Sequence, residues 1–191
     1  MKPLSKEQLT DIPIIQLEDI YLRPIQYEDF EDVYDYGKDD EVTRLLTWDS
    51  FDSVDEAKMA ITHVFLTRPD NDVPSAYAIV DLKTDKMIGT CDFFRVDWDQ
   101  GVGEIGYVLH KDFWGKGYMT QATKALIDFG FNYLKLDTIE IGHAEDNIGS
   151  RRVIEKCGFR LVDKRMHKRL NRLTYYYEMT RTDYDKLYKS K

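Results

Sequence analysis

The sequence predicts one domain of the α/β class, with strands and helices interleaved along the chain. Three observations support this prediction. Apolar residues alternate with polar ones in some segments, as in half-buried strands. In other segments they recur every three or four residues, as in amphipathic helices. The 191 residues are enough for one domain that buries about 70% of its unfolded surface. The expected order is strand, two helices, three strands, helix, strand, helix and two strands.

The N-terminal part contains the first strand. Residues 1–18 are mixed in character and interrupted by prolines, so we expect an extended lead-in. Residues 20–25 alternate and predict an edge strand, because Pro24 has no N–H to donate to a neighbouring strand.

Two helices should follow. Residues 27–37 have one apolar face and end at Gly37, a typical C-terminal stop. Residues 54 to about 66 carry a broad apolar stripe. Ser53 is expected to cap that second helix, with Glu56 completing a capping box.

The C-terminal two thirds alternate between the two periods. A helix is predicted at residues 118–134, and a second one starts at Asp146 or Asn147 and ends at Gly158. The remaining strands are expected at residues 76–80, 87–96, 104–110, 138–144, 159–166 and 174–179.

Composition and charge exclude several functions. The net charge is −8, which argues against general nucleic-acid binding, since that needs a basic face. An acidic protein suits a cationic substrate, although the same charge also serves solubility. No stretch approaches the ~18 apolar residues of a membrane span, and the N-terminus lacks the apolar run of a secretion signal. We therefore expect a cytoplasmic protein without membrane contact.

Cysteine and histidine usage points away from disulfides and metals. Cys91 and Cys157 lie far apart in the sequence and are expected to be buried thiols. The four histidines are scattered, and none forms a pair with metal-ligand spacing. We expect no metal site.

Residues 113–120, Phe-Trp-Gly-Lys-Gly-Tyr-Met-Thr, are the most informative segment. They form a glycine-rich turn between the strand at 104–110 and the helix at 118–134. Such a turn gathers backbone N–H groups, and the helix start adds unpaired donors and the positive end of the dipole. The segment therefore predicts a site for a phosphate-bearing cofactor.

Three types of glycine loop bind phosphates, and two do not fit. A dinucleotide loop needs a third glycine where this chain has Thr120. A Walker loop needs a lysine after its second glycine. Gly101 and Gly106 have the right glycine spacing, but Tyr107 stands at the lysine position.

The third type fits. Residues 114–119 resemble the pyrophosphate loop of the GNAT superfamily, the acetyl-CoA-dependent N-acetyltransferases. Residues 147–159 resemble the N-x-x-S-x-R-V-x-E-K-x-G-F element of its RimJ/RimL-like branch, the ribosomal-protein N-terminal acetyltransferases. The resemblance is specific from residue 104 to 159.

The resemblance implies a fold and a domain arrangement. It implies the GNAT acyl-CoA N-acyltransferase fold, with a mixed, mostly antiparallel sheet of about seven strands and helices on both faces. The acetyltransferase domain is expected at residues 19–182, between the lead-in at 1–18 and a C-terminal tail at 183–191.

The resemblance also implies acetyl-CoA as co-substrate. The backbone of Val108, Leu109 and His110 is expected to bind the pantetheine arm, with Asn147 as a further contact. Met119 departs from the small residue that the family prefers at its position. The residues expected around the pyrophosphate are Trp114, Gly115, Lys116, Gly117, Tyr118, Met119 and Thr120.

Catalytic roles follow from the same resemblance. Glu104 is the expected general base, unless it only forms a salt bridge. His143 and Glu145 are the second choice. The family's usual tyrosine acid is replaced by Ile154, so Ser150 is expected to protonate the leaving thiolate. Ordinary helix capping is the alternative role for Asn147 and Ser150.

The acceptor is a primary amine, with a protein N-terminal α-amine preferred. Such an amine has a pKa of about 7.7–8.0, against about 10.4 for lysine, so a weak base suffices to deprotonate it. A small amine, an amino acid or an antibiotic is the alternative acceptor. A CoA-binding or interaction module without catalysis also stays open, and exposed edge strands allow a homodimer. Among the aromatic residues, Trp48, Phe51, Phe93, Phe94 and Trp98 are candidates for lining the acceptor site.

Overall fold

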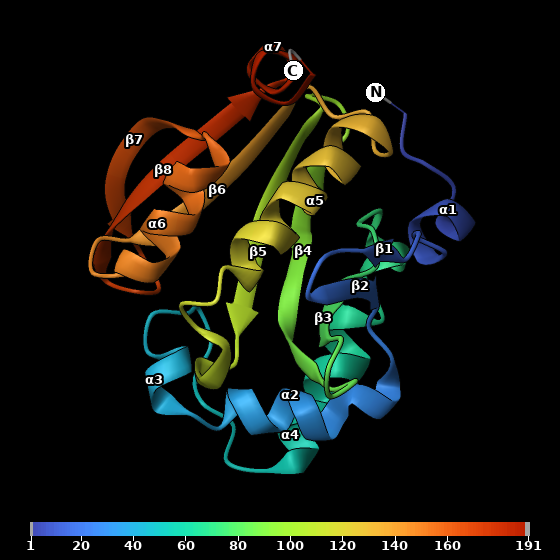
Figure 1. Cartoon of the computed structure of the whole chain (residues 1–191), viewed down its shortest axis with the longest axis vertical. Coiled ribbons are helices and arrows are strands. Elements are labelled where there is room, and N and C mark those ends of the chain that lie inside the picture. Colours follow the sequence, from blue (N-terminus) through green and yellow to red (C-terminus); the bar gives the residue numbers. More distant parts are fainter. Residues whose placement is uncertain (1, 190–191) are drawn as a thin grey trace.

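The computed structural model describes residues 2–189 and contains one mixed sheet of eight strands (Figure 1). The strand order is β1-β2-β3-β4-β5-β6-β8-β7. Every neighbouring pair is antiparallel except β5 and β6, which are parallel. The strands are β1 Ile15–Gln16, β2 Ile20–Pro24, β3 Tyr77–Asp81, β4 Met87–Asp97, β5 Val102–Leu109, β6 Thr138–Ala144, β7 Arg160–His167 and β8 Arg172–Thr180.

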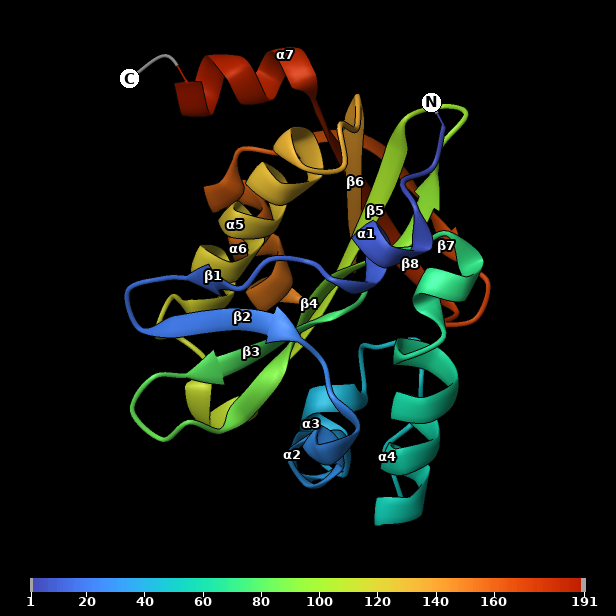
Figure 2. The ribbon, with the colours of Figure 1, turned by 90° about the vertical axis from the view of Figure 1, so that its right-hand side faces the viewer.

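Helices cover both faces of the sheet (Figure 2). The long helices α5 and α6 lie on one face, and α2 and α4 lie toward the other. The α-helices are α1 Lys6–Thr10, α2 Phe30–Gly37, α3 Asp40–Thr43, α4 Val54–Ala60, α5 Tyr118–Asn132, α6 Ile148–Cys157 and α7 Arg181–Tyr184. Short 3₁₀ turns occupy Tyr27–Asp29, Arg68–Asn71 and Lys111–Phe113, and π turns occupy Ile61–Phe65 and Asp185–Lys189.

Strand β3 shows how the two layers form. All five of its residues are buried. Tyr77 and Ile79 belong to the apolar core beneath α5, whereas Ala78 and Val80 belong to the core beneath α2 and α4. Successive side chains of a strand point to opposite faces, so a continuous apolar run fits a strand that is covered on both sides.

Strands β5 and β6 separate part-way along their length. They pair only from Val102–Thr138 to Ile105–Ile141. Beyond Ile105, β5 continues alongside β4 as far as Leu109, and β6 continues alongside β8 as far as Ala144. A gap therefore opens between the two strands near the middle of the sheet.

The fold agrees with the expectation of a mixed, mostly antiparallel sheet with helices on both faces. The strands and longer helices lie within about two residues of their predicted bounds. The sheet has eight strands rather than about seven, because β1 had no detectable pattern in its two residues. Strand β2 is therefore not the edge of the sheet, since Leu22 and Tyr21 pair with β1.

The N-terminal lead-in is more ordered than expected. Residues 6–10 form helix α1, whose N-cap Ser5 makes a capping box with Gln8. Leu9 and Ile12 are buried in the core beneath α5. The prediction of an extended lead-in is wrong here, because tertiary burial of these apolar residues stabilises a helix too short to form alone.

One helix cap differs from the predictions, and the C-terminal tail has structure that they did not address. Ser53 makes no side-chain cap at α4, and Glu56 accepts a hydrogen bond from the N–H of Asp52 instead, so the capping box does not form. The tail at 183–191 contains part of α7 and a π turn as far as residue 189, and Tyr184 is buried in the core. Residues 190 and 191 lie outside the described part of the chain.

Both cysteines are buried free thiols, as predicted. Within residues 2–189, no group of three or more His, Cys, Asp or Glu residues could hold a metal ion. In the same range, no helix is long and apolar enough to cross a membrane.

Candidate active site

The glycine turn before α5 has the backbone geometry of a phosphate cradle. Gly115 and Gly117 have φ angles of 76° and 85°, in the left-handed region that favours glycine. A Cβ atom at either position would meet nothing within 4 Å, so the turn borders open space. Gly117 is the N-cap of α5, and no side chain caps this helix. The first N–H groups of α5 therefore have no acceptor inside the helix.

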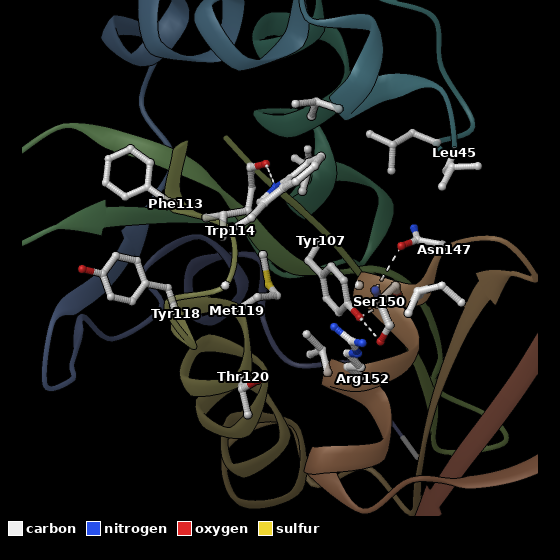
Figure 3. Close-up of a pocket in the computed structure, with 18 of the residues that line it drawn as sticks. Leu45, Tyr107, Phe113, Trp114, Tyr118, Met119, Thr120, Asn147, Ser150 and Arg152 are labelled. Carbon is white, nitrogen blue, oxygen red and sulfur yellow. Dashed lines mark hydrogen bonds between the residues drawn. The ribbon is translucent and has the colours of Figure 1, made fainter. Parts of the chain in front are cut away.

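The open space is a cavity of about 570 Å³, called here the loop cavity (Figure 3). It is bounded by the end of β5, the glycine turn, the start of α6 and residues from 41 to 46. The predicted cofactor residues that line it are Val108, Leu109, Trp114, Gly115, Gly117, Tyr118, Met119, Thr120, Asn147 and Ser150.

Two predicted cofactor residues, His110 and Lys116, do not line the loop cavity. The N–H of His110 donates to the carbonyl of Ile88, and its Nε2 lies 3.4 Å from a carboxylate oxygen of Asp35. Lys116 places its Nζ 4.6 Å from the centre of the Phe113 ring. Neither side chain is brought to the cavity wall in this structure.

Met119, the residue that departs from the family pattern, is buried in the core beneath α5 while also lining the cavity. The larger side chain is accommodated without filling the turn, since nothing approaches the open side of Gly115 or Gly117.

Three cations that were not among the expected cofactor residues line the loop cavity, although Arg152 and Lys156 occupy the arginine and lysine positions of the motif at 147–159. They are Arg44, Arg152 and Lys156. Among the described residues, none of the three has an acidic partner within salt-bridge distance. Arg152 and Lys156 are four residues apart on α6, so their like charges repel each other. An anionic ligand in the cavity would relieve that repulsion.

Tyr107 on β5 and Ser150 on α6 contact each other beside the gap between β5 and β6. The phenol oxygen of Tyr107 lies 2.8 Å from the hydroxyl oxygen of Ser150. The N–H of Ser150 donates to Oδ1 of Asn147 at 3.0 Å, so Asn147 is the N-cap of α6. Burial raises the pKa of Tyr107 far above its usual value, so the phenol stays protonated. The motifs did not indicate Tyr107, because it is 43 positions from Ser150.

The strand register decides which β5 amides face the gap. The N–H of His110 donates to Ile88 at the end of the β4–β5 ladder. Antiparallel ladders alternate, so the N–H of Val108 is directed toward β4, and those of Tyr107 and Leu109 are directed toward the gap. The carbonyl of Leu109 also faces that side, where it accepts a hydrogen bond from Nε1 of Trp114 at 2.7 Å.

A second cavity, of about 740 Å³, lies against the sheet on its α2 and α4 side and is called here the sheet cavity. Gly106 and Gly142 line it, and the absence of a Cβ at Gly106 leaves room for the ring of Phe94, which would lie only 2.9 Å from such an atom. Of the candidate aromatics, Phe93 and Trp98 are buried in the core, and three line this cavity, namely Trp48, Phe51 and Phe94. The two cavities share the residues Leu45, Leu46, Tyr107, Val108, Asn147 and Ser150.

Glu104 lines the sheet cavity and forms an ion pair with Arg95. Nε and Nη2 of Arg95 donate to Oε2 of Glu104 at 3.0 and 2.8 Å. Arg95 also donates to Glu140, the cross-strand neighbour of Glu104, at 3.2 Å. Within residues 2–189, Oε1 of Glu104 receives no hydrogen bond, so this oxygen is available to a ligand.

A buried ion pair also lines the sheet cavity. Asp92 on β4 accepts from Arg68 at 2.7 Å, and both side chains line the sheet cavity. Burial raises the pKa of Asp92 despite the neighbouring guanidinium. Arg68 also donates to the carbonyl of Phe93 at 3.1 Å, which fixes it in place.

The second-choice bases lie in different surroundings. His143 lines the sheet cavity, but its ring is buried, with Nδ1 2.7 Å from the Ala144 carbonyl and Nε2 3.1 Å from the Tyr177 hydroxyl. Desolvation lowers the pKa of His143, so the ring is neutral at pH 7. Glu145 is exposed and lines neither cavity.

Comparison with known proteins decides the family. Residues 19–160 match the model of the acetyltransferase (GNAT) domain. The chain belongs to the GNAT acetyltransferase family. A relative of this acetyltransferase is the uncharacterised N-acetyltransferase p20 of Bacillus licheniformis, which is 33% identical over 147 residues. That match covers 74% of the present chain and 79% of p20.

Solved structures share the fold of this acetyltransferase at lower identity. RimL, a ribosomal L7/L12 α-N-protein acetyltransferase in complex with coenzyme A, has a TM-score of 0.78 and 18% identity, covering 90% of this chain and 99% of RimL. Spermidine N-acetyltransferase from Vibrio cholerae, in complex with CoA and spermine, has a TM-score of 0.74 and 15% identity. That match covers 87% of this chain and 98% of the Vibrio protein.

The acetyltransferase takes its acetyl group from acetyl-CoA, as its family does. The loop cavity fits this ligand, because it combines unpaired helix amides, an open glycine turn and three cations without acidic partners among residues 2–189. A diphosphate is recognised by groups of these kinds. When bound, the co-substrate supplies a thioester whose acetyl carbon accepts the amine.

Proposed function

We propose that this acetyltransferase moves the acetyl group directly to a protein N-terminal α-amine, as members of the RimJ/RimL-like branch do. The main observation behind this proposal is that the loop cavity and the sheet cavity share the lining residues Tyr107, Val108, Asn147 and Ser150. A thioester held in one cavity and an amine held in the other can meet there.

An acyl-enzyme route is disfavoured by the state of the cysteines. Cys91 and Cys157 are both buried, and burial raises the pKa of Cys157 to about 12 and that of Cys91 well above its usual value. A thiol is a poor nucleophile until it loses its proton. Direct transfer therefore needs no residue of this chain to carry the acetyl group.

In this proposal the glycine turn and α5 bind the diphosphate through the amides of residues 115–120, and Arg152 and Lys156 add charge. The N–H groups of Tyr107 and Leu109 hold the pantetheine arm in the gap and face the thioester oxygen. A donor of this kind contributes about 10²–10³ in rate when it stabilises an oxyanion.

Glu104 is the proposed base. Its Oε2 is held by Arg95, and Oε1 remains available to accept a proton from the amine, directly or through a water molecule. Arg95 thus holds the orientation of the acceptor oxygen.

Ser150 is the proposed acid. Its hydroxyl gives a proton to the departing thiolate, and the serine oxygen regains a proton from water. The phenol of Tyr107, which keeps its own proton, lies 2.8 Å from this oxygen and donates a hydrogen bond that stabilises it. Asn147 fixes the start of α6 and so holds Ser150 in position.

Two considerations support the α-amine as acceptor. At neutral pH about a tenth of such amines are already neutral, against a few parts in ten thousand for lysine. The fold is also shared with RimL and with a ribosomal-protein-S5-alanine acetyltransferase from Vibrio fischeri, at 18% and 20% identity. A small polyamine is the second candidate, because the spermidine enzyme has the same fold.

The test is to incubate the purified protein with acetyl-CoA and a panel of N-terminal peptides, lysine-containing peptides with blocked N-termini, and spermidine. Release of free CoA thiol gives the rate, and mass spectrometry locates the acetyl group. We expect acetylation of the α-amine. Acetylation of spermidine alone would favour the second candidate. Binding of acetyl-CoA without turnover on any amine would favour a non-catalytic module.

A further inference from the structure

The turn between β7 and β8 brings a basic segment to the wall of the sheet cavity. Arg165, His167 and Arg169 all line this cavity, together with Leu170 and Thr174 from the same turn and strand. The amine side of the active site is therefore bordered by guanidinium groups.

The charges of the sheet cavity differ in sign from those of the whole chain. The chain has a net charge of −8. The cavity, however, is lined by three arginines, Arg68, Arg165 and Arg169, and two carboxylates, Asp92 and Glu104. The net charge of the chain suggests that it attracts polycations. The lining of the sheet cavity does not have the negative charge that such an attraction requires.

Both carboxylates are already neutralised. Asp92 is paired with Arg68 at 2.7 Å, and Glu104 is paired with Arg95 at 2.8 Å. Arg169, in contrast, has no acidic partner within salt-bridge distance among residues 2–189. The charge left without a counter-ion at the cavity wall is positive.

Arg165 is held in a fixed place by its neighbours. Its guanidinium lies 4.0 Å from the centre of the Tyr176 ring, and Nη1 donates to Asp163 at 2.7 Å. Stacking of this kind restricts a guanidinium while leaving other N–H donors free. In register, Arg165 pairs with Thr174, which pairs with Ala144 at the end of β6.

That register gives an approximate reach. Two strand spacings separate Arg165 from Ala144, which is about 10 Å. Ala144 lies at the open end of the gap where the amine must arrive. An extended peptide advances about 3.3 Å per residue, so about three residues cover this distance.

We propose that the acceptor is a peptide N-terminus with an acidic residue within its first three or so positions, and that Arg165 and Arg169 bind that carboxylate. This inference rests on the proposed function. It adds a selectivity that the α-amine alone does not give. Guanidinium–carboxylate contacts are charge-assisted, and Arg169 is free to form them.

The experiment compares peptides of equal length that begin with alanine. One continues with two aspartates, the second with two asparagines and the third with two lysines. For the wild-type protein, kcat/KM is expected to be about tenfold higher for the aspartate peptide than for the asparagine peptide, as one charge-assisted contact would give. The lysine peptide should be the poorest.

Variants then locate the source of the preference. In the double variant R165Q/R169Q, the advantage of the aspartate peptide should shrink to about twofold. The rate on the asparagine peptide should stay within about twofold of wild type. Lys168→Gln is the matched control, because Lys168 lies in the same turn but does not line the cavity. It should keep most of the preference.

A charge reversal gives an independent outcome. R165E/R169E should favour the lysine peptide over the aspartate peptide. Equal wild-type rates on the three peptides would overturn this inference while leaving α-amine acetylation intact. An equal loss of preference in Lys168→Gln would also overturn it. The preference would then come from the overall electrostatic field of the turn rather than from contacts with these two arginines. If no peptide is acetylated although acetyl-CoA binds, the proposed function fails and this inference fails with it.

Discussion

The phenol oxygen of Tyr107 on β5 lies 2.8 Å from the hydroxyl oxygen of Ser150 on α6. This contact joins the two elements that border the loop cavity on either side of the gap. Because burial raises the pKa of Tyr107, the phenol keeps its proton and can donate a hydrogen bond to the hydroxyl oxygen of Ser150, the proposed acid for the thiolate.

Removing either hydroxyl should slow the chemical step. Ser150→Ala is expected to lower kcat by about 10², at the lower end for a general acid. Tyr107→Phe should lower kcat by about tenfold, because it removes one hydrogen bond. The double variant should be little worse than Ser150→Ala alone, since the two groups act as a unit. Steady-state kinetics at saturating acetyl-CoA measure this.

Tyr133→Phe is the control for that series. It removes a phenol oxygen that donates to the Gln8 carbonyl at 3.0 Å, far from either cavity. It should leave kcat unchanged. Strictly additive losses for Tyr107 and Ser150 would contradict a shared role.

Replacing Glu104 by glutamine should lower kcat/KM by about 10²–10⁴ and remove the acidic limb of the pH–rate profile. Glutamine keeps the size and shape of the side chain but cannot accept the proton of the amine. Glu140→Gln is the matched control, because Glu140 pairs in register with Glu104 and shares Arg95 but lines neither cavity. Full activity of Glu104→Gln with an unmoved acidic limb would exclude Glu104 as base.

Gly117→Glu should weaken acetyl-CoA binding by at least about tenfold, because a carboxylate would face the phosphates. Gly117→Ala separates charge from strain. Its Cβ would meet nothing within 4 Å, but the φ of 85° costs an L-residue about 1–2 kcal/mol. Both variants should lose similar stability, and only the glutamate should lose most of the affinity, as measured by calorimetry. Equal affinity in all three proteins would place the diphosphate elsewhere.

The glycine turn and the start of α6 could be predicted because their signals are local. Gly115, Gly117, Asn147 and Ser150 each lie within a short motif whose backbone geometry follows from neighbouring residues. The short N-terminal elements could not be predicted, because α1 depends on the burial of Leu9 against residues far along the chain.

The rest of the candidate site depends on topology. Tyr107 meets Ser150 only because β5 and α6 are brought together across the gap. Among the cations of the loop cavity, Arg152 and Lys156 belong to the motif at 147–159, whereas no local pattern connects Arg44 with them. Likewise, the β7–β8 turn reaches the amine side only through the strand order β6-β8-β7.

Stability should fall in mild acid through His143. Desolvation lowers the pKa of the folded imidazole, whereas the unfolded one titrates near 6.5. Below about pH 6.5 the unfolded state therefore binds more protons than the folded state, and stability is lost as the pH falls toward the folded pKa. The slope is at most about 1.4 kcal/mol per pH unit.

Urea unfolding between about pH 7.5 and pH 5.5 measures this contribution. His143→Gln should remove part of the pH dependence. His63→Gln, which changes an exposed ring, should not. An identical pH slope in wild type and His143→Gln would show that this residue is not the source.

The two cysteines should not react with thiol reagents in the native protein. The pKa of Cys157 is raised to about 12 by burial, and Cys91 is more deeply buried still. A disulfide reagent at mildly alkaline pH should therefore find no fast-reacting thiol, and two thiols per chain after unfolding in urea. A rapid native reaction would mean that one cysteine is reached by solvent.

The separation of β5 from β6 has a consequence for association between molecules. Unpaired backbone groups at the rim of a sheet invite pairing with foreign strands. Here the N–H groups of Tyr107 and Leu109 that face the gap lie in the interior of an eight-stranded sheet, behind α5 and α6. A narrow, flexible ligand can reach these N–H groups, whereas a strand of another molecule cannot pair with them. The protein therefore has hydrogen-bond donors available for its ligand without exposing an aggregation-prone sheet edge.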